Sequence, residues 1–209
     1  KITAHGAGSV GGEVRLMAGA ALVQADGSLL GNGQVQLDGG LIDTTAGAGG
    51  VNGTVLIRAQ RNDANTDLQI GQGLGSPATS VLGATRIEVE AVRQYQAAAI
   101  GQSLITKVNA DNAAFAGTHG ANATQVRNRV GALLAQPQNI QLRAGVEVIQ
   151  ADPTADMVVT GNTTAGGWNL TSFDALGNAL AQPTGAPVNL TLRAAGNLAV
   201  RASISDGFV

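Results

Sequence analysis

The stretch Ile87-Glu88-Val89-Glu90-Ala91 decides the fold, because its pattern of apolar residue, any residue, apolar residue, any residue and alanine occurs five times. Alternation with period two places Ile87, Val89 and Ala91 on one face of a β-strand and the two glutamates on the other. The other copies occupy residues 14–18, 55–59, 140–144 and 190–194, and a sixth at 35–39 ends in glycine. Such a repeat predicts strands that stack with one buried face.

The spacing of the first copies favours a parallel β-solenoid. Copies that begin at Val14, Val35 and Val55 lie about 20 residues apart, a typical length for one solenoid turn. Clusters of Gly and Asn between the copies supply the positive φ angles that tight corners need. An antiparallel sandwich would also show alternation, but it would more often carry aromatic core residues, and aromatics make up only 2% of this chain. We therefore predict an all-β chain with one aliphatic column inside.

One stretch departs from the strand pattern. In residues 92–138 the glycine corners thin out, and an apolar helical face predicts an inserted α-helical hairpin; this face comprises Val126, Val130, Leu133 and Leu134. Residues 1–91 and 139–209 are then coils of the same solenoid, which form one domain. We expect Tyr95 and Phe115 to seat the insert and Arg127 and Arg129 to face water. The insert either contacts a partner or caps a weak flank of the solenoid.

Composition narrows the functional classes. The chain has 209 residues, 30 of them glycine, with 12 basic and 14 acidic side chains and a net charge of -2. A net charge this small predicts no electrostatic attraction to nucleic acid or to an anionic membrane. The absence of cysteine excludes disulfides and thiolate metal sites. No apolar run is long enough for a membrane span, and a start at Lys1 suggests an excised part of a longer chain.

The chemistry-bearing residues do not assemble into an active site in the sequence. His5 and His119 are the only histidines, so we expect no metal site, and no phosphate-binding or dinucleotide loop is present, so we expect no cofactor. The best enzymatic candidate is the pair Glu88 and Glu90, which share a strand face about 6.6 Å apart. That separation lies near the range of inverting glycosidases. Outward carboxylates more often keep a strand soluble, so we expect no enzyme and no catalytic residues.

A few residues are candidates for contact with a partner. Arg127, Arg129 and His119 lie in the helical insert, outside the strand repeat. Trp168 and Phe173 flank a Gly-rich segment and could stack against a sugar, or they could close the apolar column at a corner.

An ordered series of phrases in the second half of the chain resembles a known family. The series is EAVRQY at 90–95, LRAGVEV at 142–148, WNL at 168–170, LTLRAAGNL at 190–198 and SISDGF at 203–208. It is similar to the C-terminal region of filamentous haemagglutinin-type exoproteins, over roughly residues 86–209. The Asn-Pro-Asn-Gly signature of the family's secretion domain does not occur in this sequence.

The resemblance implies a right-handed parallel β-helix and a biological setting. Proteins of this family are exported by two-partner secretion through an outer-membrane transporter, and are secreted or displayed on the Gram-negative cell surface. The implied function is a non-catalytic shaft segment of an adhesin that binds a cell-surface protein or glycan receptor. Two alternatives stay open: a carbohydrate-active β-helix that uses Glu88 and Glu90, and a self-assembling extracellular filament whose subunits associate end to end.

Overall fold

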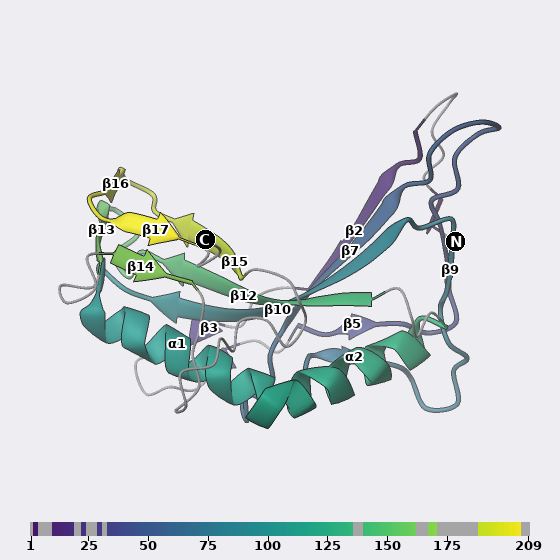
Figure 1. Cartoon of the computed structure of the whole chain (residues 1–209), viewed down its shortest axis with the longest axis horizontal. Helices are drawn as coiled ribbons and strands as arrows, with labels where there is room; N and C mark the ends of the chain where they lie inside the picture. Colours follow the sequence, from purple (N-terminus) through teal and green to yellow (C-terminus); the bar gives the residue numbers. More distant parts are fainter. Residues whose placement is uncertain are drawn as a thin grey trace.

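The computed structural model is mostly β, with a curled parallel sheet and two α-helices (Figure 1). It describes residues 2–3, 10–18, 22–23, 29–30, 33–135, 140–161, 167–170 and 188–205. The mostly-β class expected from the alternating pattern is thus confirmed.

The copies of the repeated phrase lie in one five-stranded, wholly parallel sheet. Its order is β15 (Asn189–Arg193), β12 (Ile140–Ile149), β10 (Arg86–Gln96), β7 (Thr54–Gln60) and β2 (Glu13–Met17). The first residues of four copies stand side by side, because Val55 pairs with both Val14 and Ile87, and Ile87 pairs with Ile140. The fifth copy is displaced, since Leu190 pairs with Val146 and not with Ile140. The alternating pattern therefore identified the strands of the central sheet, but it did not indicate that the fifth copy is shifted along its neighbouring strand.

Smaller sheets form the other walls. Three are parallel: β1 (Ile2–Thr3), β6 (Leu41–Asp43) and β9 (Ser80–Leu82); β11 (Ala99–Gly101), β13 (Met157–Gly161) and β16 (Leu198–Val200); and β14 (Gly167–Asn169) with β17 (Ser203–Ser205). A fourth parallel pair joins β5 (Val35–Gln36) to β8 (Ile70–Gly71), and β3 (Leu22–Val23) pairs antiparallel with β4 (Leu29–Leu30). Between successive strands of the central sheet, the chain contributes strands to the smaller sheets.

The 20-residue period predicted from the sequence is wrong. The phrase at 35–39 contains β5, and its Val35 pairs with Ile70, outside the central sheet. Val14 and Val55 are therefore direct partners. β5, which the period places between them as a separate turn of the solenoid, lies in another sheet. A short period-two pattern marks a strand, but it does not say to which sheet the strand belongs.

Among the described residues, the interior consists of two apolar clusters and not one column. The first core contains Val14, Val55 and Ile87 with residues of α2, and the second core contains Tyr95, Val146 and Trp168 with residues of α1. Leu190 packs against the second core, away from Val14 and Val55. The long strands β10 and β12 contribute residues to both cores. Because these cores are separate clusters, the prediction of a single apolar column is wrong.

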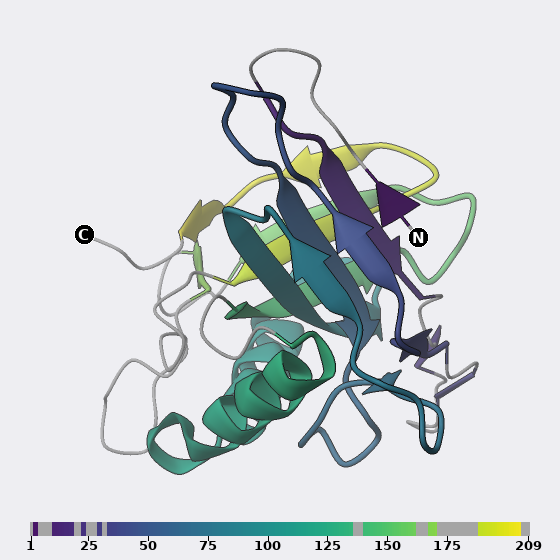
Figure 2. The ribbon, with the colours of Figure 1, turned by 90° about the vertical axis from the view of Figure 1, so that its right-hand side faces the viewer.

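The two helices lie along one side of the central sheet (Figures 1 and 2). α1 spans Gln102–Ala116, a 3-10 turn spans Thr118–Gly120, and α2 spans Ala121–Leu133. The strands β10 and β11 continue past residue 92, so the helical part begins later than the expected insert boundary. Figure 1 shows the helices one after the other along the long axis, which corrects the expected hairpin.

Local sequence explains how the helices turn and dock. Gly117 and Gly120 have φ angles of 72° and 73°, which L side chains rarely adopt, so glycine permits the redirection between the helices. The predicted apolar face is confirmed, because Val126, Val130 and Leu134 are buried in the first core. No helix in the described residues has both the length and the apolar character of a membrane span.

Candidate functional site

A row of charged side chains covers the face of the central sheet opposite the cores. We call it the ionic row: Glu88 and Glu90 on β10, Arg58 on β7, Arg143 and Glu147 on β12, and Arg193 on β15. Register creates it, because Arg58, Glu90 and Arg143 are aligned on neighbouring strands. Opposite charges on adjacent parallel strands attract one another. The row is therefore a product of strand stacking and not of a local motif.

The two glutamates singled out in the sequence are both held by arginines. Glu88 lies 3.3 Å from Nε of Arg143 and 3.7 Å from Nη2 of Arg86. It also accepts a hydrogen bond of 3.3 Å from the side-chain amide of Asn189. Glu90 lies 3.4 Å from Nε of Arg58, and its side chain is only 8% exposed. Both carboxylates thus have cationic partners within the sheet.

Glu147, which the sequence did not single out, is the most enclosed member of the row. Its side chain is 1% exposed and accepts hydrogen bonds from Gln94 at 2.8 Å, Arg193 at 3.1 Å and Arg58 at 3.2 Å. These three donors come from three different strands. Only the sheet register brings them together, so no spacing within the sequence could have indicated this cluster.

The pKa values of Glu90 and Glu147 move in opposite directions. Burial raises the pKa of Glu90, and the nearby charge of Arg58 opposes that rise only in part. Burial alone would also raise the pKa of Glu147, but hydrogen bonds from Gln94 and Arg193, with the charge of Arg58, lower it overall. At neutral pH, Glu147 is therefore a well-stabilised anion.

The ionic row offers little room for a substrate. A cavity of about 150 Å³ beside it is lined by Met17, Ala18, Arg58, Ala59, Gln60, Val92, Glu147 and Arg193. Neither Glu88 nor Glu90 lines this cavity. The arrangement can neutralise charge between stacked strands, whereas glycoside hydrolysis needs two carboxyl groups flanking a sugar.

Among the helix residues proposed for partner contact, Arg129 is bonded within the molecule, although its side chain remains 36% exposed. Its guanidinium lies 2.6 Å from Oδ1 of Asp67 and donates to the carbonyl oxygens of Ile70 at 2.7 Å and Leu68 at 3.2 Å. Asn122 donates to the carbonyl oxygens of Thr66 and Phe115, both at 2.7 Å. These bonds fasten α2 to the segment between β7 and β8. Arg129 thus holds α2 in place while it is still partly exposed, and Arg127 is half-buried.

A polar seam separates the two cores under α1. It comprises Arg61, Asn65, Arg93, Asp111 and Asn112. Arg61 is 1% exposed and donates to the carbonyl oxygen of Ala91 at 3.0 Å and to Oδ1 of Asn112 at 2.7 Å. Its guanidinium carbon also lies 4.4 Å from the centre of the Phe115 ring. Burial lowers the pKa of Arg61 to about 10, so it remains a cation at neutral pH.

Asp111 on α1 is the common partner of the other polar side chains in this region. The hydroxyl of Tyr95 donates to it at 2.9 Å, and Arg93 and Lys107 lie 3.2 and 3.1 Å away. Burial and the charge of Asp111 raise the pKa of Tyr95, so its phenol stays protonated as a donor. The expectation that Tyr95 and Phe115 seat the helices is confirmed, but the sequence did not indicate the buried Arg61 between them.

The remaining candidates are either enclosed or outside the described part of the chain. Trp168 is 1% exposed in the second core, so it cannot stack against a sugar and the reading as a core residue is the right one. Phe173 and His5 lie outside the described residues, and for His119 the structure describes only the backbone, in the 3-10 turn. Within the described residues, no group of three or more His, Cys, Asp and Glu side chains could hold a metal ion.

Comparisons with known proteins found no matching protein family, curated protein or solved structure. The function therefore has to be argued from the geometry above.

Proposed function

We propose that this chain is a non-catalytic shaft segment of a large secreted or surface-displayed adhesin, built as a right-handed parallel β-helix. The observation that supports it best is the central sheet, in which four copies of one phrase stand in register on parallel strands. A chain that repeatedly returns to the same parallel sheet extends in one direction, as solenoids do. The sequence resemblance to filamentous haemagglutinin-type exoproteins supplies the adhesive role and export through an outer-membrane transporter.

The ionic row favours a structural role over catalysis. Glu88, Glu90 and Glu147 each have at least one arginine within 3.4 Å. A general acid or a nucleophile needs a carboxyl group that can reach a substrate, whereas these groups neutralise arginines on neighbouring strands. Their chemistry suits a rod that stacks charged strands without repulsion.

The helices act chiefly as a cover for the two cores. Buried residues of α1 include Ile105 and Val108, and those of α2 include Val126 and Val130. The outer surfaces of the same helices remain available to a receptor. Removing residues 92–136 would expose both cores, so a test of receptor binding has to change the outer surface and leave the buried face intact.

Attachment can be measured directly with beads that carry the purified chain. Coated beads should adhere to epithelial or bacterial cells more than beads coated with an unrelated protein of similar charge. Asn128→Glu changes an exposed residue of α2, and Arg201→Glu is a control on an exposed residue of the C-terminal strands. Reduced adhesion of the first variant alone supports a receptor site on α2; equal adhesion of coated and control beads contradicts the adhesive role.

The carbohydrate-active alternative is tested on the same preparation. Incubation with a panel of acidic and neutral polysaccharides, followed by measurement of reducing ends and of unsaturated products, should give no turnover. Turnover that disappears in both Glu88→Gln and Glu90→Gln would show that the chain is an enzyme and contradict the non-catalytic shaft role.

A further inference from the structure

A groove of about 490 Å³ lies between α2 and the turn that connects β7 to β8. Its volume is within the range of small-ligand pockets, about 300 to 1,000 Å³. The helix residues that line it are spaced three or four apart, so they share one side of α2. The lining consists of Asn122, Gln125, Val126 and Arg129 from α2, with Thr66 and Asp67 from the turn.

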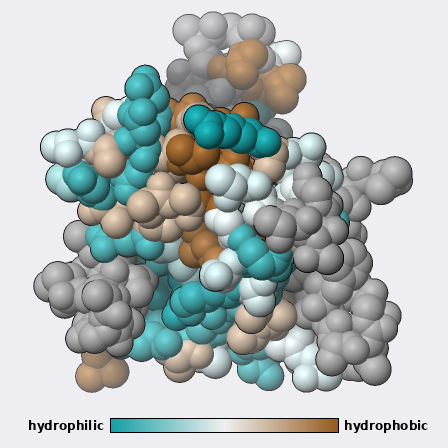
Figure 3. Space-filling model, turned by 90° about the vertical axis from the view of Figure 1, so that its left-hand side faces the viewer, coloured by the Kyte–Doolittle hydropathy of each residue, from teal (hydrophilic) through white to brown (hydrophobic). Residues whose placement is uncertain are grey.

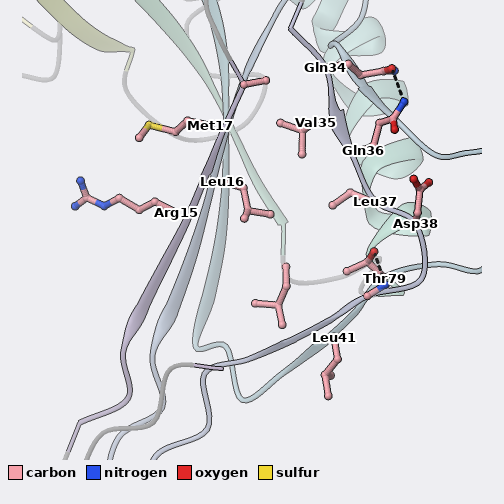
Figure 4. A pocket seen from close by; sticks show the side chains of 13 residues that line it. Arg15, Leu16, Met17, Gln34, Val35, Gln36, Leu37, Asp38, Leu41 and Thr79 are labelled. Atoms are coloured by element: carbon pink, nitrogen blue, oxygen red, sulfur yellow. Dashed lines mark hydrogen bonds between the residues drawn. The ribbon is translucent and has the colours of Figure 1, made fainter. Parts of the chain in front are cut away.

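This groove differs from the larger apolar surfaces of the molecule. Figure 4 shows a cleft of about 550 Å³ in which Leu16 of β2 faces Val35 and Leu37. Figure 3 shows a hydrophobic patch on the side where β13, β14, β16 and β17 lie in Figure 1. Both surfaces involve outermost strands, which neighbouring turns of a shaft would cover. The groove is formed by a helix and a turn, so it stays open to a separate ligand in a shaft.

Hydrogen bonds within the molecule fix both walls of the groove. Oδ1 of Asn62 accepts the backbone N–H groups of Thr66 and Asp67, at 2.8 and 3.1 Å. Nη2 of Arg129 lies 2.6 Å from Oδ1 of Asp67. The side-chain amide of Asn122 donates to the carbonyl oxygen of Thr66 at 2.7 Å. Because the turn and the helix are already joined, a ligand would meet a preorganised surface, which lowers the entropic cost of binding.

After these internal bonds, the groove still has acceptors and donors for a ligand. Among the described residues, the hydrogen bonds to the Asp67 carboxylate all go to Oδ1, and Oδ2 accepts none. In the same part of the chain, Oδ1 of Asn122 and the exposed amide of Gln125 also have no partner. The hydroxyl of Thr66 accepts a bond of 3.3 Å from Asn62 and can donate its own proton.

The groove is polar but carries no net charge. Arg129 and Asp67 form an ion pair, so their charges cancel and attract neither an anion nor a cation. Val126 is only 3% exposed, and none of the six lining residues is aromatic, so little apolar surface is offered. A matching ligand is neutral and carries groups that both donate and accept hydrogen bonds. The hydroxyl groups of a sugar have these properties.

We propose that this groove binds a neutral glycan, with Asp67, Asn122 and Gln125 as hydrogen-bonding partners of its sugar hydroxyl groups. The proposal rests on the adhesive role and names the chemical class of the receptor. Neighbouring hydroxyl groups of one sugar can reach the acceptors of the turn and the amide of α2 together. A single groove of this kind binds weakly, because each bond replaces one to water. Many copies on one surface then attach firmly through avidity.

Binding is tested by saturation-transfer NMR of the intact chain with lactose, maltose, cellobiose, mannobiose and diacetylchitobiose. At least one of these neutral disaccharides should receive saturation from the protein. Sialyllactose and a sulfated heparin disaccharide should not bind more tightly than the best neutral sugar. Saturation of none of the neutral sugars, or a clear preference for the anionic ones, overturns the proposal.

Variants locate the bound sugar. Gln125→Ala and Thr66→Ala should each weaken binding about fivefold, the effect of losing one net hydrogen bond. Gln141→Ala and Thr124→Ala are matched controls, because both residues are exposed and lie outside the groove. Thermal melting checks that all four variants are folded. Binding that survives both groove substitutions, or that falls equally in the controls, would show that the sugar does not bind in this groove.

The bead assay separates this proposal from the adhesive role. If the sugar that binds in solution also inhibits bead adhesion, the groove is the attachment site. Beads that adhere while no neutral sugar binds would overturn the glycan groove and leave the adhesive role standing. Sugar binding that depends on Gln125 and Thr66, with beads that do not adhere, would support the groove and contradict the adhesive role.

Discussion

The two cores of this protein are built from different kinds of side chain. The first core is almost entirely aliphatic, with Phe115 as its one aromatic among the described residues, and it lies under the four aligned copies of the repeat. The second core contains Tyr95, Met157 and Trp168, and it lies under the displaced fifth copy. The regular core follows the repeat in the sequence, while the larger and less regular side chains accompany the shift in register.

The polar seam explains how two cores share one sheet. On β10 the inward-facing residues run from Ala91 through Arg93 to Tyr95, and on α1 they run from Val108 through Asn112 to Phe115. Both elements therefore change from one core to the other at a polar residue. Arg61 bridges these two places by hydrogen bonds to Ala91 and Asn112. The seam is where the two halves of the molecule are coupled.

Removing Arg61 is the strongest way to break this coupling. Arg61→Ala leaves buried acceptors of Ala91, Asn65 and Asn112 without their donor. A buried acceptor left without its donor costs about 1 to 3 kcal/mol, and Arg61→Ala leaves several of them. Urea unfolding followed by circular dichroism should show that loss, and hydrogen exchange should show the second core opening separately from the first.

Arg127→Ala provides the control for this experiment, because Arg127 lies on α2 and is only half-buried. Its effect should stay within about 0.5 kcal/mol, as for most surface changes. Equal unfolding midpoints for Arg61→Ala and Arg127→Ala would mean that the two cores do not depend on the seam.

The regular half of the fold could be predicted from the sequence, and the irregular half could not. Period-two alternation identifies the strands of the central sheet, because burial of one face demands it. It cannot identify pairing partners, since Val35 and Val55 carry the same local pattern and lie in different sheets. The helical face of α2 was predictable from Val126 and Val130, but the end-to-end arrangement of the helices depends on Gly117 and Gly120.

The candidate site was less predictable than the fold. Glu88 and Glu90 could be found because they are neighbours on one strand. Their partners Arg58 and Arg143 are aligned with Glu90 only through the register of separate strands. Arg61 follows a strand with no motif around it, so nothing in the local pattern distinguishes this buried cation from a surface arginine.

A smaller effect is expected at Gly145 on β12, which lies beside Glu90 of the ionic row and whose carbonyl oxygen accepts a bond from Arg61. A Cβ at this position would lie 2.6 Å from Oε1 of Glu90, so Gly145→Ala has to displace that side chain from Arg58. Overpacking of this kind costs about 1 to 3 kcal/mol. Gly40→Ala is the matched control, because a Cβ there meets only Thr79 at 3.9 Å.

The same substitution tests whether Gly145 is required for Glu90 and not for the strand itself. In a double-mutant cycle with Glu90→Ala, the cost of Gly145→Ala should largely disappear, since the obstructing carboxylate is gone. An undiminished cost in the Glu90→Ala background would show that the backbone of β12, and not the ionic row, needs glycine.

The smallest expected effect separates two carboxylates of the ionic row by their pH dependence. The pKa of Glu147 is lowered in the folded protein from an ordinary value of 4.5, so its stabilisation is fully present above that value and is lost as pH falls through the lowered pKa. Glu147→Gln should therefore cost about 1.5 kcal/mol at pH 7, the lower end of the range for a hydrogen bond to a charged group, and progressively less as pH falls.

Glu90 should behave in the opposite way. Its pKa is raised by burial, so the folded state favours the protonated form and its contribution falls as pH rises through the raised pKa. Glu90→Gln should consequently be neutral or stabilising at pH 7, unlike Glu147→Gln, and its effect should approach zero at acidic pH, where Glu90 itself is protonated. Urea midpoints of both variants at pH 3, 5 and 7 measure this difference. Parallel pH profiles would mean that the two carboxylates share one environment, and that the enclosure of Glu147 by Gln94, Arg58 and Arg193 does not set it apart.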